Sequence, residues 1–253
     1  MRRILVVMAV VMMMCAVGLG AWGRFNEKAD EPIPCGGKTP FKYWTDRHDA
    51  LVKLAKKGDI DVAFFGDSLT DFWATDGKKV WEKEYAPLKA ANFGIGGDQT
   101  QYVIYRMANG ELDGMKPKVV VLEIGTNNMA VSHHTPAETV IGIKGVVKLV
   151  REKLPESKIL LLAVFPQGQT AKDPSRVDID AVNKEIAKLD DGKMVTYLDF
   201  NAKFLDAEGN KLNDLRLGDG AHLSEKGFQV WADAMRETLA KLMAGMPQTQ
   251  PAK

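Results

Sequence analysis

Short apolar segments alternate with longer helical patterns along most of this chain of 253 residues, and this alternation constrains the fold more than any other feature. Two of the segments, 119–122 and 159–164, are uninterrupted runs of aliphatic residues. Such runs are typical of strands that are covered on both faces, as the central strands of a parallel sheet are. We therefore predict a three-layer α/β fold, in which a parallel sheet lies between two layers of helices.

The predicted elements follow one another in order after a first helix over 46–57. The expected strands are 61–65, 91–93, 119–124, 158–164 and 195–199, and the expected helices are 80–86, 101–109, 137–154, 175–189 and 224–243. Residues 22–44 are mostly polar and contain proline and glycine, which predicts an extended N-terminal arm. Residues 45–244 are then one domain. The tail 245–253 contains two prolines and two glutamines and is predicted to be disordered.

The first 21 residues have the pattern of a secretory signal peptide. Met1, Arg2 and Arg3 form a basic start, and residues 4–20 are apolar and end in small residues. The protein is therefore expected to be secreted or periplasmic, with no membrane span after cleavage. An uncleaved N-terminal anchor is the alternative, because the apolar stretch is of borderline length. Lipidation at Cys15 is less favoured, since three methionines precede it.

Charge and cysteine content exclude some partners and crosslinks. The formal charge is +1, and loss of Arg2 and Arg3 takes the 34 basic residues to 32, against 33 acidic ones. Because basic and acidic residues are interspersed, nucleic acid is not an expected partner. Without the signal peptide Cys35 is the one remaining cysteine, which excludes an internal disulfide and leaves pairing between chains open. Its Pro-Cys-Gly-Gly turn predicts an exposed thiol.

A candidate nucleophile follows the first predicted strand. Gly66, Asp67 and Ser68 come directly after the apolar run 62–65. Ligands bind at the carboxyl ends of the strands in open parallel sheets, because loops leave the sheet there and helix N-termini offer unpaired N–H groups. Ser68 is therefore a candidate nucleophile. Taken alone, the turn is more simply explained as a helix N-cap formed by Ser68 or Asp67.

A candidate base and its partner lie near the other end of the chain. Asp219 and His222 are three residues apart before the closing helix, so both can face one point. A serine hydroxyl is a weak nucleophile until a base removes its proton, and a third group must orient that base. We expect Asp219 to orient His222 and His222 to deprotonate Ser68. The alternative is a capping or packed histidine.

Two further segments can supply donors to a developing oxyanion. The segment 92–100 is rich in glycine, which permits positive φ and close approach of the backbone to a ligand. An ordinary strand-to-helix turn is the alternative, whereas a phosphate loop is disfavoured because neither nucleotide-binding glycine pattern is complete. Asn127 follows the strand over 119–124, and its amide is either a second donor or part of an ordinary turn.

Together these segments place Ser, Gly, Asn and the Asp/His pair on one edge of the predicted sheet. The sequence thereby resembles the SGNH (GDSL-type) hydrolase superfamily, whose blocks are Gly-Asp-Ser, a Gly before Asp, Gly-x-Asn and Asp-x-x-His. Within the superfamily it is most similar to the platelet-activating factor acetylhydrolase catalytic subunits and their bacterial secreted relatives. The similar segments include 65–70, 92–98, 109–112 and 125–128. The resemblance implies a flavodoxin-like strand order, the SGNH hydrolase fold, over 45–244.

The resemblance also implies a role for each candidate residue. Ser68 would be the nucleophile, His222 the base and Asp219 its partner. The oxyanion hole would consist of the Ser68 N–H, the Gly97 N–H and the Asn127 side chain. No metal and no cofactor is implied. The loop 206–217 departs from the eukaryotic subunits, which leaves the choice of substrate open.

We therefore expect a secreted serine esterase that hydrolyses short acyl esters, in particular acetyl esters, on carbohydrates or other small molecules. A phospholipid acetylhydrolase of the platelet-activating-factor type is the alternative substrate class. A non-catalytic binding module on the same fold is the alternative of another kind, and a flavin-binding or nucleotide-binding protein is less favoured than either. A homodimer is left open.

Some residues have two interpretations at this point. Arg106 and Glu123 are either a buried pair or ordinary surface charges. Four aromatic side chains either shape a substrate pocket or belong to the core, namely Phe72, Trp73, Trp81 and Phe165.

Overall fold

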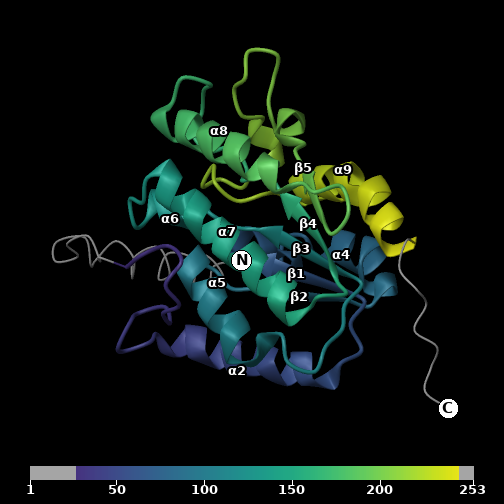
Figure 1. Ribbon diagram of the computed structural model, residues 1–253. Coiled ribbons are helices and arrows are strands. Elements are labelled where there is room, and N and C mark those ends of the chain that lie inside the picture. The colour runs from purple at the N-terminus through teal and green to yellow at the C-terminus, as the bar shows by residue number, and fades with distance from the viewer. Residues whose placement is uncertain (1–26, 245–253) are drawn as a thin grey trace.

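A five-stranded parallel sheet forms the centre of the computed structural model, which describes residues 27–244 (Figure 1). In sequence order its strands are β1 (Val62–Gly66), β2 (Ala90–Gly94), β3 (Val119–Glu123), β4 (Lys158–Leu162) and β5 (Val195–Leu198). In space they are ordered β2-β1-β3-β4-β5, and all neighbours are parallel. This is the flavodoxin-like order that the resemblance implies, so the predicted fold class is confirmed.

Helices cover both faces of the sheet (Figure 1). One face carries α2 (Lys42–Lys57), α5 (Thr100–Arg106), α7 (Pro136–Lys153) and α8 (Pro174–Ile186). The other carries α4 (Lys78–Glu84) and α9 (Glu225–Ala244). The short helices α3 (Ser68–Asp71) and α6 (Thr126–Ala130) closely follow β1 and β3. Further short helical turns are Phe72–Ala74, Ala86–Leu88, Met107–Glu111, Ala187–Leu189, Asn201–Phe204 and Asn213–Leu215.

The central strand β3 shows why the sheet strands have unbroken apolar sequences. Val120 and Leu122 pack into the core on the α5 and α7 side of the sheet, whereas Val119 and Val121 pack into the core on the α9 side. All four side chains are at most 1% exposed. Because successive residues of a strand point to opposite faces, a strand with helices on both sides needs apolar residues at every position.

Helix α2 begins at Lys42, four residues before its predicted start. Phe41 has extended backbone at the N-cap, and Trp44, His48 and Leu51 bury one face of the helix. The spacing of these buried residues follows the helical repeat. The arm predicted over 22–44 therefore ends in helical residues.

The prediction of an exposed thiol at Cys35 is wrong. Cys35 is 7% exposed and belongs to the same core as Trp44, because the turn that carries it packs against the domain. The predicted signal peptide, residues 1–21, and the predicted tail, residues 245–253, lie outside the described residues. Within 27–244 no helix combines the length and the apolar character that a membrane span requires.

Candidate active site

The predicted nucleophile lies where the strand order reverses, at the carboxyl ends of β1 and β3, which is where ligands bind in sheets of this topology. Ser68 is the first residue of α3, and its side chain is partly exposed. The N-cap of this helix is Asp67, whose carboxyl group accepts from the Leu69 N–H at 3.0 Å. Because Asp67 caps the helix, the Ser68 hydroxyl is left for another contact.

That contact is His222, 154 positions away in the sequence. The Ser68 Oγ lies 2.8 Å from His222 Nε2, and His222 Nδ1 lies 2.6 Å from Asp219 Oδ2. Partial burial works against ionisation of Asp219, but hydrogen bonds from the His222 ring and from the backbone N–H groups of Ala221 and His222 outweigh it and lower the pKa of Asp219. The structure thus brings the three residues together as a carboxylate, an imidazole and a hydroxyl in hydrogen-bonded series.

Two buried cationic side chains hold the turn 219–222. Lys211 Nζ donates to the Gly220 carbonyl at 2.7 Å, and Arg216 Nη1 donates to the Ala221 carbonyl at 2.8 Å. Both side chains lie in the domain interior, and their residues are 9% and 6% exposed. Because packing fixes these side chains, the carbonyls of the turn have fixed donors, and the imidazole that follows them has a defined position.

Phe72 packs against the imidazole from the side of α3. The ring centroids of Phe72 and His222 are 4.5 Å apart, and the rings are inclined by 26°. The other aromatic side chains with two interpretations belong mainly to the core: Trp73 and Phe165 are fully buried, and Trp81 is partly buried against Trp73. Phe72 is therefore the one of the four that touches the predicted base.

Two backbone N–H groups close to the Ser68 hydroxyl are free to bind a ligand. Throughout residues 27–244, no carbonyl or side chain accepts a hydrogen bond from the N–H of Ser68 or of Gly97. Gly97 has φ of 84°, a backbone conformation that favours glycine. A Cβ added to the preceding Gly96 would lie 3.8 Å from Ser68 Cβ. The turn after β2 therefore passes directly beside the predicted nucleophile.

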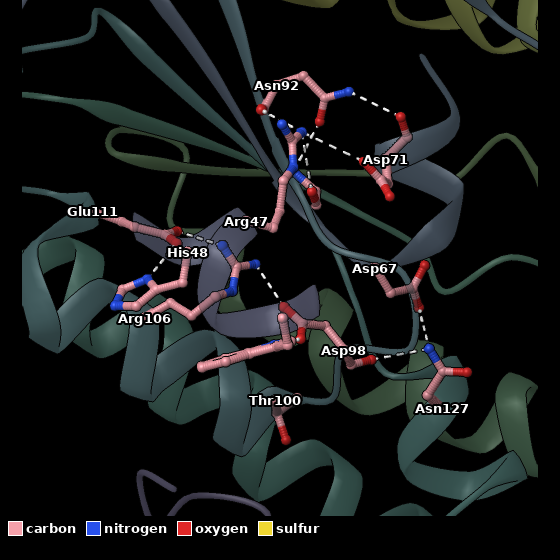
Figure 2. A network of polar contacts seen from close by, with 12 residues as sticks. Arg47, His48, Asp67, Asp71, Asn92, Asp98, Thr100, Arg106, Glu111 and Asn127 are labelled. Atoms are coloured by element: carbon pink, nitrogen blue, oxygen red, sulfur yellow. Dashed lines mark hydrogen bonds and ion pairs between the residues drawn. The ribbon is translucent and has the colours of Figure 1, made fainter. Parts of the chain in front are cut away.

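Asn127, the third predicted donor, lies at the same edge but its amide is engaged. Asn127 Nδ2 donates to the Asp98 carbonyl at 3.0 Å and to Asp67 Oδ2 at 3.2 Å (Figure 2). The amide has two hydrogens, so both are used. An oxyanion at Ser68 would have to take one of these hydrogens. The contact with Asp67 is the longer of the two, and it weakens when Asp67 is protonated.

A buried network of side chains ties the turn after β2 to α2 (Figure 2). Its members are Trp44, His48, Asp98, Arg106 and Glu111. Asp98 accepts from Trp44 Nε1 at 2.7 Å and forms an ion pair with Arg106 at 2.7 Å. Arg106 also pairs with Glu111, which lies 2.8 Å from His48 Nδ1. The Arg106 charge is thus buried and paired, but with Asp98 and Glu111 and not with Glu123.

Glu123 is the last residue of β3, and its carboxyl group is buried with little hydrogen bonding. It is 1% exposed, and in the described part of the chain neither of its carboxyl oxygens makes a hydrogen bond of good geometry. Burial and the nearby charge of Asp67 raise the pKa of Glu123 well above its ordinary value, although the backbone N–H of Phe165 and the charge of Arg216 oppose this. Burial likewise raises the pKa of Asp67 to about 7. Both carboxyl groups therefore hold protons at mildly acidic pH.

Glu123→Gln is expected to reduce the pH dependence of stability. The native state keeps the Glu123 proton above pH 4.5, whereas the unfolded chain releases it, so this contribution to stability is fully present below pH 4.5 and is lost as the pH rises toward the raised pKa. Between pH 5 and pH 8, the free energy of unfolding measured by urea titration should fall at least about 1 kcal/mol less in the variant than in the wild type. The exposed control Glu152→Gln should follow the wild type. Equal falls in all three proteins would show that Glu123 is ionised in the native state.

No candidate metal centre coincides with Ser68 in the described part of the chain. Across 27–244, no three His, Cys, Asp or Glu side chains are grouped so that they could hold a metal ion. A cavity of about 250 Å³ lies beside α4, and it is lined by Trp73, Ala74, Lys78, Trp81, Glu82 and Asn92. This lining does not include Ser68, Asp219 or His222.

Comparisons with known proteins agree with the fold and with the sequence blocks. Residues 64–230 match the model of the GDSL-like lipase/acylhydrolase family. Platelet-activating factor acetylhydrolase IB subunit alpha1 of Homo sapiens is 34% identical over 230 residues, which cover 88% of this chain and 96% of the human protein. Subunit alpha2 of Rattus norvegicus is 33% identical over 208 residues, which cover 81% of this chain and 87% of the rat protein.

Solved structures resemble the chain in fold. A putative acylhydrolase from Bacteroides fragilis superposes with a TM-score of 0.66 at 19% identity, covering 81% of this chain and all of that one. An acetylxylan esterase from Geobacillus stearothermophilus superposes with a TM-score of 0.58 at 18% identity, covering 78% of this chain and all of that one.

The fold and the family match define a carboxylic ester hydrolase of α/β architecture. This chain belongs to the GDSL-like lipase/acylhydrolase family, as its sequence blocks predict.

Proposed function

We propose that the protein is a secreted serine esterase that removes short acyl groups, in particular acetyl, from carbohydrates through a Ser-His-Asp mechanism. The observation that carries this proposal is the contact of Ser68 Oγ with His222 Nε2 at 2.8 Å, with Asp219 at 2.6 Å on the other ring nitrogen. The same geometry argues against a non-catalytic binding module, because a module without selection for catalysis would not need to keep all three groups in series.

In the proposed mechanism Ser68 Oγ attacks the ester carbonyl while His222 Nε2 accepts its proton. The ionised Asp219 orients the ring and stabilises the imidazolium. The proton then passes to the leaving alkoxide, which leaves an acyl-enzyme on Ser68. Water, deprotonated by His222, attacks the acyl carbon, and the Ser68 oxygen leaves with the returned proton. The N–H groups of Ser68 and Gly97 and the Asn127 amide would bind the oxyanion of both tetrahedral intermediates.

Secretion and the carbohydrate substrate are supported by different observations. The basic start and apolar stretch of residues 1–21 support an extracytoplasmic location, where acetylated glycans are available as substrates. One protein of the same fold is an acetylxylan esterase. The alternative substrate class, short-chain acetyl phospholipids, is supported by the relatives at 34% identity, which are platelet-activating factor acetylhydrolase subunits.

A panel of substrates tests the reaction and the substrate class together. p-Nitrophenyl esters from acetate to octanoate report the acyl length that the site accepts, and acetylated xylo-oligosaccharides and a short-chain acetyl glycerophospholipid report the alcohol part. We expect the highest kcat/KM with acetate and a higher kcat/KM with the oligosaccharides than with the phospholipid. A higher kcat/KM with the phospholipid would show that the substrate is a phospholipid and not a carbohydrate. If none of the esters is hydrolysed, the protein is not an esterase.

Arg216→Met is expected to lower turnover without unfolding the protein. The variant keeps the apolar length of the side chain but removes the donor to the Ala221 carbonyl, so the imidazole of His222 loses a fixed support. Small misplacements of a catalytic group cost up to about a hundredfold, and we expect a fall in kcat of about tenfold or more with a smaller change in KM. Thermal unfolding is measured in parallel. Lys226→Met, an exposed cation on α9, is the control, and an unchanged kcat in Arg216→Met would exclude this role.

A further inference from the structure

Two exposed aromatic side chains stand at the start of α2. Phe41 is 43% exposed and Tyr43 is 46% exposed, and within residues 27–244 they are the aromatic members of the exposed large hydrophobic set. Their rings stack, with centroids 6.2 Å apart and an inclination of 14°. Exposed aromatic rings leave apolar surface in water, and such patches commonly mark binding sites.

The position of this aromatic pair beside the site is fixed by the residue that follows it. Trp44 is fully buried and donates to Asp98 at 2.7 Å, so the first turn of α2 is anchored to the turn after β2. As a result, a Cβ added to Gly97 would lie 3.7 Å from the Tyr43 hydroxyl, and one added to Gly96 would lie 3.8 Å from Ser68 Cβ. Two glycines without side chains therefore form the surface between Tyr43 and the nucleophile.

The distance across these two glycines identifies the part of a substrate that reaches Tyr43. An acetyl group extends by only one methyl carbon from the carbonyl carbon that Ser68 attacks. It is too short to cross from Ser68 over Gly96 and Gly97, so a group that contacts the aromatic pair belongs to the alcohol part of the ester.

The polar groups beside Phe41 and Tyr43 favour binding of a neutral polyol over binding of a phosphate. Two cations lie close to the pair along α2, and both are already engaged by carboxylates. Lys42 pairs with Asp46 at 2.7 Å, and Arg47 pairs with Asp71 at 3.4 Å and faces the Gly94 carbonyl at 3.4 Å. The Asp71 carboxyl lies beside Gly96 and offers an acceptor to hydroxyl groups. Flat aromatic faces with a few polar groups beside them are the composition of a small-molecule site that binds a ring.

We propose that Phe41 and Tyr43 form a subsite that binds the sugar ring of the alcohol part of the substrate, with the C–H face of a pyranose against the aromatic pair. This assignment rests on the proposed function, in which Ser68 is acetylated. It makes Phe41 and Tyr43 determinants of specificity and gives them no part in proton transfer.

The test compares a ring substrate with one that is too small to reach the pair. kcat and KM are measured with methyl tri-O-acetyl-β-D-xylopyranoside and with ethyl acetate. In the double variant Phe41→Ala/Tyr43→Ala, the ratio of kcat/KM values for xyloside over ethyl acetate should fall about tenfold, mainly through KM of the xyloside, because both aromatic contacts with the sugar ring are lost. Tyr43→Phe keeps the ring and should retain most of the wild-type ratio. Ile141→Ala, an exposed apolar residue on α7, should not change it.

Other results would contradict the sugar subsite or the mechanism on which it rests. An unchanged ratio in the double variant overturns the subsite, and so does an equal loss on both substrates. If a short-chain acetyl glycerophospholipid loses more kcat/KM than the xyloside does, the pair binds lipid and the sugar assignment is wrong. A separate experiment tests the underlying mechanism: if Ser68→Ala still hydrolyses the ester, the proposed function itself is wrong. Thermal unfolding of every variant separates loss of folding from loss of binding.

Discussion

Ser68→Ala should abolish ester hydrolysis while the protein stays folded. In the proposed mechanism no other group can form the acyl-enzyme, and removal of a catalytic serine from a working triad costs about 10⁴-fold or more in kcat. The serine side chain is small and partly exposed, and the cap of α3 is supplied by Asp67, so its loss should have little effect on stability. The measurement is kcat on p-nitrophenyl acetate, with thermal unfolding as the check on folding.

The control for this prediction is Ser132→Ala, a partly exposed serine that hydrogen-bonds to Gln99 away from the imidazole. It should turn over the ester at the wild-type rate. If purified Ser68→Ala retains more than about one hundredth of the wild-type kcat, another nucleophile does the chemistry and the mechanism is wrong.

Asn127→Ala should lower kcat by about a hundredfold to a thousandfold, the typical cost of one oxyanion donor. For this loss to occur, the amide must exchange one of its existing hydrogen bonds for the oxyanion, because it donates to Asp67 and to the Asp98 carbonyl. The oxyanion would take the hydrogen that Asp67 now accepts, which is easier when Asp67 is protonated. Because burial raises the pKa of Asp67 to about 7, this exchange should depend on pH near neutrality.

The result is read from kcat and KM on p-nitrophenyl acetate, since a donor that acts in the transition state lowers kcat and kcat/KM together. Asn109→Ala, an exposed asparagine far from the nucleophile in sequence, is the matched control. A loss of less than about fivefold in Asn127→Ala would mean that the amide keeps its contacts with Asp67 and Asp98 during turnover, and that the N–H groups of Ser68 and Gly97 suffice.

The fold was predictable because strands buried on both faces have a simple sequence signature. The run at 119–122 lies within β3, and the run at 159–164 begins in β4 and extends two residues past its end. The predicted alternation agrees with the order of elements. The strand order itself came from the resemblance, because periodicity contains no information on which strands are neighbours. Boundaries differ where side-chain packing extends a helix, as at α2, where burial of Trp44 adds a turn before the predicted start.

The candidate residues of the site could be named from the sequence, but the side chains that hold them in place could not. Ser68, Gly97, Asn127, Asp219 and His222 were identified from four short blocks. Lys211 and Arg216 lie in a loop of mixed polar and charged residues, where they look like surface charges, and only the folded turn reveals that they hold carbonyls. The Asp98, Arg106 and Glu111 network was missed for a similar reason: a charge is recognisable in a sequence, but its burial and its partner depend on tertiary contacts.

Covalent labelling tests the central claim most directly. Diethyl p-nitrophenyl phosphate phosphorylates a serine that a neighbouring base has activated, and the adduct is located by intact and peptide mass spectrometry. We predict one diethylphosphoryl group per chain, on Ser68, with activity lost in proportion to labelling. Complete inactivation with the label on another residue, or full activity with Ser68 labelled, would contradict the account.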